Sequence, residues 1–234
     1  MSAAAADRLV RLSYPLSETS LTHPVLERLT IRPRNRIAEG ADYNTSVISA
    51  ENHCGTHVDA PAHFIEGAAP IASFNPEDLR FRRAIVLDCP KGDDGLVDVA
   101  DLASLPAGGF DCLLVRTGFG VRRTSDPQAY LVCNPGLSPQ ASRYLRERFP
   151  ELACVGIDSV SMARYGRPQE ARAVHRTAFA SDTGSGRPLF FVEDMDLRPL
   201  DGLESAIEEL FVVPWQVEGV DSAPCTVLAR LCVK

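Results

Sequence analysis

The sequence predicts a single mixed α/β domain over residues 1–234. A chain of 234 residues is long enough for one substantial core and does not require two. Short apolar runs of strand length outnumber the segments with helical spacing. Because these runs are almost continuously hydrophobic, several of the strands are expected to be buried on both faces of a sheet.

The predicted strands are separated by short pieces rich in turn-forming residues. The apolar runs are AIVLDC (84–89), CLLVRT (112–117), LACVGID (152–158), PLFFVE (188–193), LFVVPW (210–215) and CTVLARL (225–231). The turn-rich pieces are PKGDDG (90–95), LPAGG (105–109) and SDTGSGRP (181–188). Each apolar run bounded in this way predicts one strand.

The clearest helix signal lies in PGLSPQASRYLRERF (135–149). Ser138 is a suitable N-cap, and Pro139 suits the first helical position. Ala141, Leu145 and Phe149 then recur at helical spacing. Shorter helices are predicted over 169–179 and 199–210. The chain therefore combines a few helices with a larger number of strands.

Composition excludes several classes of partner. The net charge is -7, and no run of lysine or arginine offers the basic face that nucleic acid requires. The small arginine groups at 80–83 and 122–123 are interpreted as solvated surface. No apolar run approaches the ~20 residues that span a bilayer. We therefore expect neither a nucleic-acid partner nor a membrane partner.

Cysteine usage indicates a reducing compartment. The chain has seven cysteines, an odd number, and none forms a CxxC pair. Most lie in apolar runs, where a thiol behaves as a small hydrophobe. The first residues, MSAAAADRLVRL, contain no apolar segment of the secretory type. These features predict reduced cysteines in a cytoplasmic protein.

Histidine is concentrated in one short segment. Of the five histidines in the chain, His53, His57 and His63 lie with Asp59 in NHCGTHVDAPAHF (52–64). In an extended chain these four odd-numbered positions leave the same face. A lone histidine on an apolar face is usually an ordinary core residue. Several histidines and a carboxylate on one face instead favour a metal site.

The spacing HxxxHxD provides a compact ligand set. His53, His57 and Asp59 offer two nitrogens and an oxygen, which suit zinc or manganese. Four residues of straight strand span roughly 13 Å, so a bend at Gly55 is expected to bring the imidazoles together. His63 could be a further ligand, but four ligands from this segment would close the site to substrate, so it is expected either to support a ligand or to transfer a proton.

Two nearby residues receive the opposite interpretation. His23, isolated in THPVL, is expected on the surface or in a loop. Cys54 lies inside the motif but has even parity, so its thiol is expected to point away from the ligand face.

These residues resemble a known family. HCGTHVDAPAHF is similar to the HxGTHxDxPxHF signature of the cyclase family of metal-dependent hydrolases, which includes bacterial kynurenine formamidase and isatin hydrolase. RLVRLSYPLS, LLVRTGF, NPGLSPQASRYLRER and VGIDSVS resemble further family segments in the same order. The resemblance extends over most of the chain, and the histidine motif is its most specific part.

The resemblance implies a fold and a site. The fold is a mixed-sheet α/β domain of the swivelling β/β/α type, usually assembled as a homo-oligomer, here a homodimer or homotetramer. The site holds one or two divalent metals, Zn²⁺ or Mn²⁺, per chain. The matching positions are His53, His57, Asp59, His175 and Glu193 as metal ligands, and His63 as general acid/base.

Sequence patterns alone give weaker support for His175 and Glu193 as ligands. His175 is the sole histidine after residue 63, and Glu193 ends an apolar strand, where a carboxylate can face a cleft. Without the resemblance, each is equally compatible with a ligand or an ordinary surface residue. Asp158, at the end of VGID, is interpreted as structural or as a support for a ligand.

The resemblance also implies an enzyme that acts on C–N bonds other than peptide bonds, as arylformamidases do. The predicted reaction is cleavage of a small-molecule formamide or cyclic amide by hydroxide held on the metal, which lowers the pKa of water from 15.7 toward ~7. His63 would protonate the departing nitrogen.

Two other functions remain open. One is a metal-assisted cyclase or dehydratase of a biosynthetic pathway, and the other is a metal-binding or scaffolding protein without turnover. A free histidine beside the ligands argues against the second. The chain also departs from kynurenine formamidases, because the region ETSLTHPVLERL (18–29) lacks their aromatic residue and the one tryptophan is Trp215.

Overall fold

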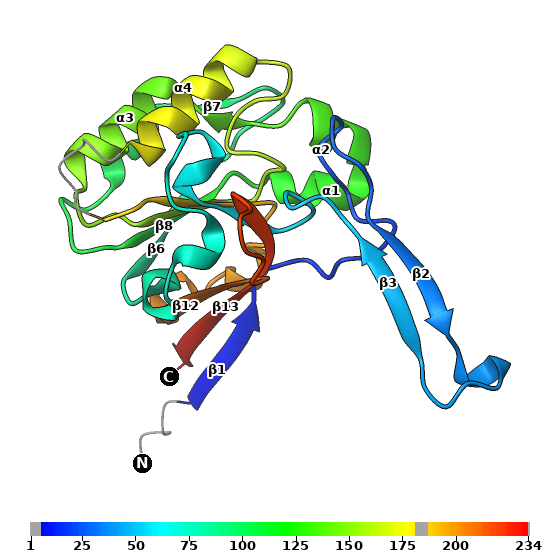
Figure 1. Cartoon of the computed structure of the whole chain (residues 1–234). Helices are drawn as coiled ribbons and strands as arrows, with labels where there is room; N and C mark the ends of the chain where they lie inside the picture. Colours follow the sequence, from blue (N-terminus) through cyan, green and yellow to red (C-terminus); the bar gives the residue numbers. More distant parts are fainter. Residues whose placement is uncertain (1–5, 181–186, 234) are drawn as a thin grey trace.

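The computed structural model describes residues 6–180 and 187–233 and shows a mixed α/β fold (Figure 1). Within these residues the main sheet has nine strands, in the order β5-β12-β13-β4-β11-β10-β8-β6, with β1 pairing β13. The turn predicted at 181–188 lies largely outside the described residues. The predicted fold class, mixed α/β, is confirmed.

The main sheet contains every strand predicted from the apolar runs. Its members are β1 (Ala6–Arg11), β4 (His57–Asp59), β5 (Arg80–Phe81), β6 (Ala84–Asp88), β8 (Cys112–Arg116), β10 (Cys154–Ile157), β11 (Phe190–Glu193), β12 (Ile207–Pro214) and β13 (Ser222–Val233). Strands β6, β8, β10 and β11 run parallel, whereas β4 pairs antiparallel with both β11 and β13.

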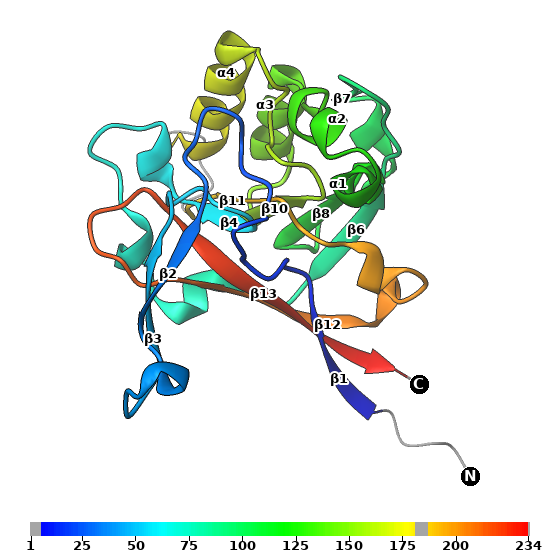
Figure 2. The same cartoon turned by 90° about the vertical axis from the view of Figure 1, so that its right-hand side faces the viewer.

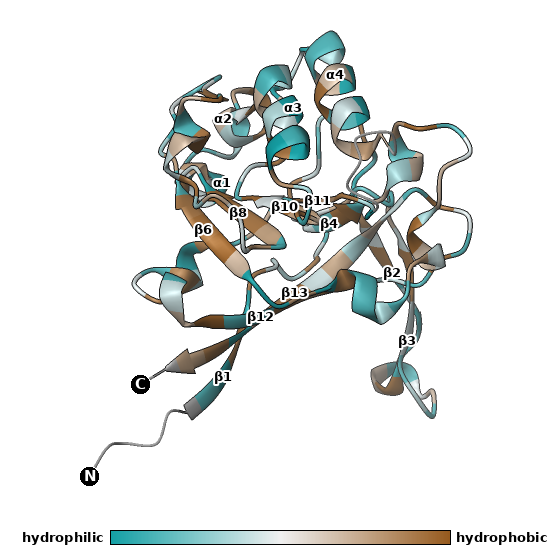
Figure 3. Ribbon diagram, turned by 90° about the vertical axis from the view of Figure 1, so that its left-hand side faces the viewer, coloured by the Kyte–Doolittle hydropathy of each residue, from teal (hydrophilic) through white to brown (hydrophobic). Residues whose placement is uncertain are grey.

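The central strands are buried on both faces, as their composition predicts. Along β11, Phe190 and Val192 join one hydrophobic cluster, whereas Phe191 joins the cluster on the opposite face. The same alternation along β8 places Leu114 on the first face and Leu113 on the second. Figure 3 shows the hydrophobic colouring of β6 and β8 beneath helices whose outer turns are hydrophilic.

Helices cover one face of this sheet (Figures 1 and 2). They are α1 (Arg122–Ser125), α2 (Pro127–Val132), α3 (Pro139–Arg148) and α4 (Pro168–Phe179). The predicted cap of α3 is present, since Ser138 Oγ accepts a hydrogen bond of 2.9 Å from the Ala141 amide. None of the helices in the described residues has the length and apolar character needed to cross a membrane.

The prediction of a helix over 199–210 is wrong. Two 3₁₀ turns, at Arg198–Leu200 and Glu204–Ala206, flank Gly202, which has a φ of 72°. From Ile207 onward the chain instead forms β12, which pairs with β13 along most of its length. Pairing with a long neighbouring strand therefore overrides the local helical preference.

Two further pairs of strands lie outside the main sheet. A short pair joins β7 (Leu96–Val97) to β9 (Gly136–Leu137). The other pair, β2 (Thr30–Asn35) and β3 (Thr45–Ser49), forms a hairpin that projects from the body of the molecule (Figure 1).

Candidate functional site

The histidine segment is bent, and only its middle is a strand. Gly55 has a φ of 64°, and a Cβ there would lie 2.5 Å from Leu16 Cδ2, so the bend requires glycine. His53 lies in the turn before it, and His57 and Asp59 lie on β4. The predicted bend is therefore confirmed.

The expectation that positions 53, 57, 59 and 63 leave one face of an extended chain is wrong. Residues Pro61–His63 form a 3₁₀ turn that begins with proline at its first position. His63 therefore does not share a strand face with His57, and the parity argument holds only for His57 and Asp59. The side chains still gather in one place, because the Gly55 bend and the 3₁₀ turn fold both ends of the segment back toward β4.

Strand pairing brings Glu193 to this segment. In the antiparallel register of β4 and β11, Glu193 lies directly opposite His57, and Phe191 lies opposite Asp59. Directly opposed residues project from the same face of the sheet. Accordingly, His57 Nε2 lies 3.4 Å from Glu193 Oε2 and 3.5 Å from Asp59 Oδ1.

Helix α4 supplies His175 from above the same face. Its imidazole packs against the ring of Phe191, with a centroid distance of 5.2 Å. His175 Nε2 lies 3.5 Å from Glu193 Oε1 and 4.0 Å from Asp59 Oδ2. With His53 Nδ1 at 3.0 Å from Asp59 Oδ1, the three imidazoles predicted as ligands lie around the two predicted carboxylates, Asp59 and Glu193.

Backbone carbonyls fix which nitrogen of two imidazoles faces the carboxylates. His57 Nδ1 donates to the Gly55 carbonyl at 2.8 Å, and His175 Nδ1 donates to the Ala171 carbonyl at 2.8 Å. A carbonyl can only accept, so Nδ1 carries the proton in both rings and Nε2 is directed at the cluster. Metal-bound histidines are typically oriented by a hydrogen bond of this kind.

The centre of the cluster contains buried polar atoms without hydrogen-bond partners. They are His57 Nε2 and both carboxylate oxygens of Asp59, whose side chain is 1% exposed. His53 Nδ1 lies 3.0 Å from Asp59 Oδ1, but the pair does not form a hydrogen bond of acceptable geometry. Buried carboxylates without partners are costly unless a cation is bound. The donor set therefore fits a divalent metal.

Charge within the cluster keeps the carboxylates ionised. Burial raises the pKa of Glu193, but the nearby imidazoles of His175 and His57 outweigh it and hold that pKa at about 2. Burial likewise raises the pKa of Asp59, and the neighbouring imidazoles bring it well below its usual range. Burial lowers the pKa of His53, whereas Asp59 and Asp221 raise it to about 10. The carboxylates of the cluster are therefore in the ionised form, which is the form that binds a cation.

Asp221 is a member of the site that the sequence did not indicate. It lies just before β13, and its Oδ2 accepts from His63 Nδ1 at 2.6 Å and from His53 Nε2 at 3.0 Å. Its Oδ1 accepts a hydrogen bond from the side-chain amide (Nδ2) of Asn52 at 2.8 Å. With Nδ1 of His63 committed to Asp221, Nε2 is the nitrogen left to exchange a proton with a substrate.

A cavity of about 300 Å³ opens onto the cluster. The imidazoles and Glu193 form one side of it, and apolar side chains that include Val25, Leu26, Phe64 and Val160 form the rest. His23 also lines this cavity. The residue lies in a loop, as predicted, but its place beside the other histidines was not expected.

The prediction of solvated surface for Arg123 is wrong. Its side chain is 15% exposed and forms a two-pronged ion pair with Asp194, at 2.9 and 3.0 Å. Tyr130 Oη also donates to Asp194 at 2.6 Å. Because Asp194 directly follows Glu193, this network holds the end of β11 in place.

Asp158 has a structural position away from the cluster. Its carboxylate accepts hydrogen bonds from the Thr117 amide and hydroxyl, at 2.8 and 2.6 Å, and from the Gly118 amide at 2.9 Å. It therefore fastens the loop after β8 to the end of β10.

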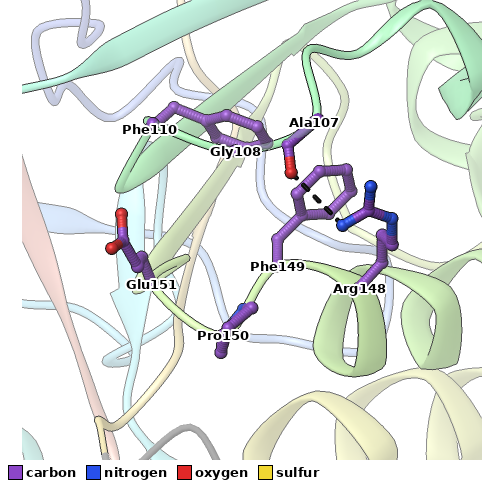
Figure 4. Close-up of a pocket in the computed structure, with 8 residues that line it drawn as sticks. Ala107, Gly108, Phe110, Arg148, Phe149, Pro150 and Glu151 are labelled. Atoms are coloured by element: carbon purple, nitrogen blue, oxygen red, sulfur yellow. Dashed lines mark hydrogen bonds between the residues drawn. The ribbon is translucent and has the colours of Figure 1, made fainter.

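A second hollow, of about 290 Å³, lies elsewhere (Figure 4). It is formed by residues 107–110, which precede β8, and by residues 148–151, which begin at the last residue of α3. Arg148 Nη1 donates to the Ala107 carbonyl across it at 3.2 Å. Its lining contains no histidine and one carboxylate, Glu151, so it lacks the donor set of the first cavity.

The fold and the site together define a mixed α/β protein with a buried histidine–carboxylate cluster of the metal-binding kind. The chain belongs to the cyclase family, because the family model described as "Putative cyclase" matches residues 10–164. The resemblance predicted from the histidine motif is thereby confirmed.

Known proteins agree with this assignment. The kynurenine formamidase of Geobacillus thermodenitrificans is 28% identical over 139 residues, which cover 58% of this chain and 63% of that protein. Cyclase-like protein 1 of Arabidopsis thaliana is 25% identical over 203 residues, covering 85% and 74%. The structure of isatin hydrolase A from Labrenzia aggregata bound to benzyl benzoate matches with a TM-score of 0.78 at 22% identity, covering 97% and 94%.

Proposed function

We propose that this chain is a metal-dependent amidohydrolase that opens a small formamide or cyclic amide. The observation that carries the proposal is the convergence of two carboxylates and three imidazoles around buried, unpartnered Asp59 oxygens. The proposed ligands of one or two Zn²⁺ or Mn²⁺ ions are His53, His57, Asp59, His175 and Glu193. The relationship to kynurenine formamidase supports a substrate with a C–N bond.

A divalent ion bound among these ligands would lower the pKa of water to about 7 and polarise a substrate carbonyl. The chain supplies the surroundings that this chemistry needs. Asp59 and Glu193 are almost fully buried, so their charges act in a medium that screens them little. The Nδ1 hydrogen bonds of His57 and His175 hold the imidazoles in one orientation, which preorganises the site before substrate arrives.

His63 is the proposed general acid. An amine is a poor leaving group until its nitrogen is protonated, and imidazole exchanges protons near neutral pH. The His63 side chain is 26% exposed at the cavity wall, so Nε2 can approach a substrate nitrogen. Asp221 orients the ring by accepting a hydrogen bond from Nδ1.

The cavity favours a small, largely apolar amide. A volume of about 300 Å³ is at the lower end of the range for small-molecule sites. Its apolar wall includes Phe64, whose ring stacks on His175 at a centroid distance of 4.5 Å. Trp215 does not line the cavity. A compact aryl or alkyl amide therefore fits better than a substrate that requires stacking on tryptophan.

A metal-assisted cyclase or dehydratase of a biosynthetic pathway is the alternative use of the same site.

Other expectations stay predictions: a single domain of the swivelling β/β/α type, a homodimer or homotetramer, and a cytoplasmic location.

The test combines metal analysis with turnover of a substrate panel. We expect at least one Zn²⁺ or Mn²⁺ per chain after reconstitution, and hydrolysis of N-formyl aryl amines, isatin or small lactams. In H₂¹⁸O, hydrolysis places one labelled oxygen in the product carboxylate, whereas dehydration places none. Asp59→Asn, which keeps the shape but removes the charge, is the matched control and should lose both metal and turnover. Less metal than one ion per two chains in the wild type would refute the proposal.

A further inference from the structure

One polar side chain of the cavity wall is not tied to the histidine–carboxylate cluster. Apart from the imidazoles and the carboxylate of the cluster, the polar side chains of the lining are Ser161 and His23. Ser161 Oγ donates to Glu193 Oε1 at 3.3 Å, so it is connected to the cluster. Within the part of the chain that the structure describes, neither ring nitrogen of His23 forms a hydrogen bond or an ion pair. His23 can therefore form hydrogen bonds with a molecule in the cavity.

The rest of the wall around His23 is apolar. It is formed by Val25, Leu26, Phe64 and Val160, together with Ala171. A few polar groups within a largely apolar lining are what fix the orientation of a small ligand and select it from similar molecules. Because the cluster is committed to the proposed metal and the scissile amide, His23 is the lining group that can recognise another part of the substrate.

Contacts on both sides of His23 hold its ring in place. The preceding residue, Thr22, is buried, and its Oγ1 lies 3.8 Å from the thiol of Cys54 in the histidine segment. The Leu26 amide donates to the His23 carbonyl at 2.9 Å, which closes a turn. The His23 ring packs against the ring of Tyr165, with a centroid distance of 5.4 Å. The imidazole is thus ordered before a ligand arrives, which lowers the entropic cost of binding.

Tyr165, the residue that supports this ring, lies on a segment that is itself fixed. The Tyr165 amide donates to Asn134 Oδ1 at 2.9 Å, and Asn134 Nδ2 donates to the Ala163 carbonyl at 2.9 Å. Asn134 is fully buried, so its hydrogen bonds form without competition from water. The support behind His23 is therefore rigid.

The His23 ring is uncharged at neutral pH. Burial lowers its pKa, and the effect of Glu193, which raises that pKa, is opposed by His57 and His53. A neutral imidazole has one N–H donor and one acceptor nitrogen. Such a ring pairs with an uncharged carbonyl or hydroxyl group, and it offers no positive charge to attract a carboxylate substituent.

We propose that His23 determines substrate specificity by forming a hydrogen bond with an uncharged carbonyl or hydroxyl group that the substrate carries in addition to its scissile amide. The proposal rests on the proposed function, because it places that amide at the cluster. A substrate with hydrocarbon in place of this group would leave the imidazole facing an apolar surface without a partner. Such a mismatch lowers affinity for the analogue that lacks the polar group.

The experiment compares formanilides whose ring substituents have nearly equal size. The substituents are acetyl, which accepts a hydrogen bond, 1-hydroxyethyl, which accepts and donates, and isopropyl, which does neither. Each is placed ortho, meta and para to the formamide, and kcat/KM is measured with the metal-reconstituted protein. For at least one ring position, the wild type should prefer the acetyl and hydroxyethyl compounds to the isopropyl compound.

His23→Phe keeps an aromatic ring against Tyr165 but removes the hydrogen bond. The preference for the polar substituents should fall by about 3–10-fold, mainly through KM, while metal content stays unchanged. The effect of each substituent on the reactivity of the amide is the same in both proteins, so it cancels when the two preferences are compared. His23→Gln, which keeps a donor and an acceptor, should retain most of the preference. Val25→Ala changes the same cavity without a polar group and is the matched control, which should leave the preference unchanged.

Calorimetric binding of the corresponding anilines provides a readout without turnover. The wild type should bind the acetyl aniline more tightly than the isopropyl aniline, and His23→Phe should lose that difference. If no formanilide is hydrolysed, the amidohydrolase proposal fails, whereas this binding difference still reports on His23. A wild type without a preference at any ring position, or a His23→Phe variant that keeps it, would overturn the proposal. Equal loss in His23→Phe and His23→Gln would also overturn it, because the hydrogen bond would then not be the cause.

Discussion

The metal-candidate cluster and the β2–β3 hairpin (residues 30–49, called the arm) depart from ordinary packing in opposite ways. At the cluster, Asp59 is a charged residue with 1% exposure and no hydrogen-bond partner for either carboxylate oxygen. On the arm, Ile48 is a large apolar residue with 55% exposure. One region buries charge and the other exposes hydrocarbon, and each arrangement is unfavourable in isolation.

The difference indicates what each region binds. A buried anion without a partner is stabilised by a cation small enough to enter a closed space, so the cluster points to a metal ion. An exposed apolar face has no charge to neutralise, so the arm offers nothing that a metal ion would bind. Because only the cluster has the chemistry of a metal site, the variants that separate the roles of its residues all lie in or beside it.

The largest effect is expected from His57→Ala. His57 lies between Asp59 and Glu193, and its removal takes a nitrogen donor from the centre of the cluster. We expect loss of metal and of turnover together, measured by elemental analysis and a substrate assay.

His23→Ala is the matched control for metal content, because His23 lines the cavity but belongs to none of the histidine–carboxylate groups. Full metal content in His57→Ala would show that the remaining donors suffice, and would remove His57 from the ligand set.

The next effect is expected from His63→Ala. If His63 moves a proton and does not hold the metal, the variant should keep its metal while turnover falls by roughly 10²–10⁴-fold. The defect should be smaller for substrates whose leaving group needs no protonation. Loss of metal equal to that in His57→Ala would instead make His63 a ligand.

Local sequence patterns predicted part of the fold and part of the site. The strands, the helices at 139–148 and 168–179, and the Gly55 bend follow from local patterns, because apolar periodicity and glycine act over a few residues. Parity was sound for His57 and Asp59, which share a strand. It did not apply to His63, because Pro61 begins a 3₁₀ turn before it.

Contacts between segments that are distant in the sequence could not be predicted from local patterns. The helix predicted over 199–210 was replaced by β12 because β13 pairs with it, and pairing between separate segments leaves little local signal. Arg123 was assigned to the surface because its partner, Asp194, lies 71 residues away. Asp221 was missed for the same reason, since it lies 158 residues from His63.

The third prediction concerns Asp221→Asn. Asparagine keeps the shape, but its uncharged carboxamide oxygen is a weaker hydrogen-bond acceptor for His63 Nδ1. A hydrogen bond to a charged group contributes about 1.5–3 kcal/mol, so kcat should fall by roughly 10–100-fold with KM little changed. The pH dependence of kcat should change as well, which a purely structural role would not produce.

Metal content decides between two roles for this residue. His53, His63 and Asp221 also form a group whose ligand atoms lie close enough together for an ion. Retention of metal in Asp221→Asn supports the positioning role, and loss of metal would make Asp221 a ligand.

The smallest effect is expected from Cys54→Ser. Cys54 lies between His53 and Gly55, yet its thiol is fully buried on the other side of the bend, with Sγ 3.8 Å from Thr22 Oγ1. Burial raises the pKa of this thiol, so it stays protonated and is a poor metal ligand. Serine can keep a hydrogen bond to Thr22, at a cost in stability of about 1 kcal/mol for the more polar hydroxyl. We expect full metal content, turnover within about twofold of the wild type, and a melting temperature lower by about 2–4 °C. Loss of metal would mean that the thiol reaches the cluster and that the bend at Gly55 has been assigned the wrong direction.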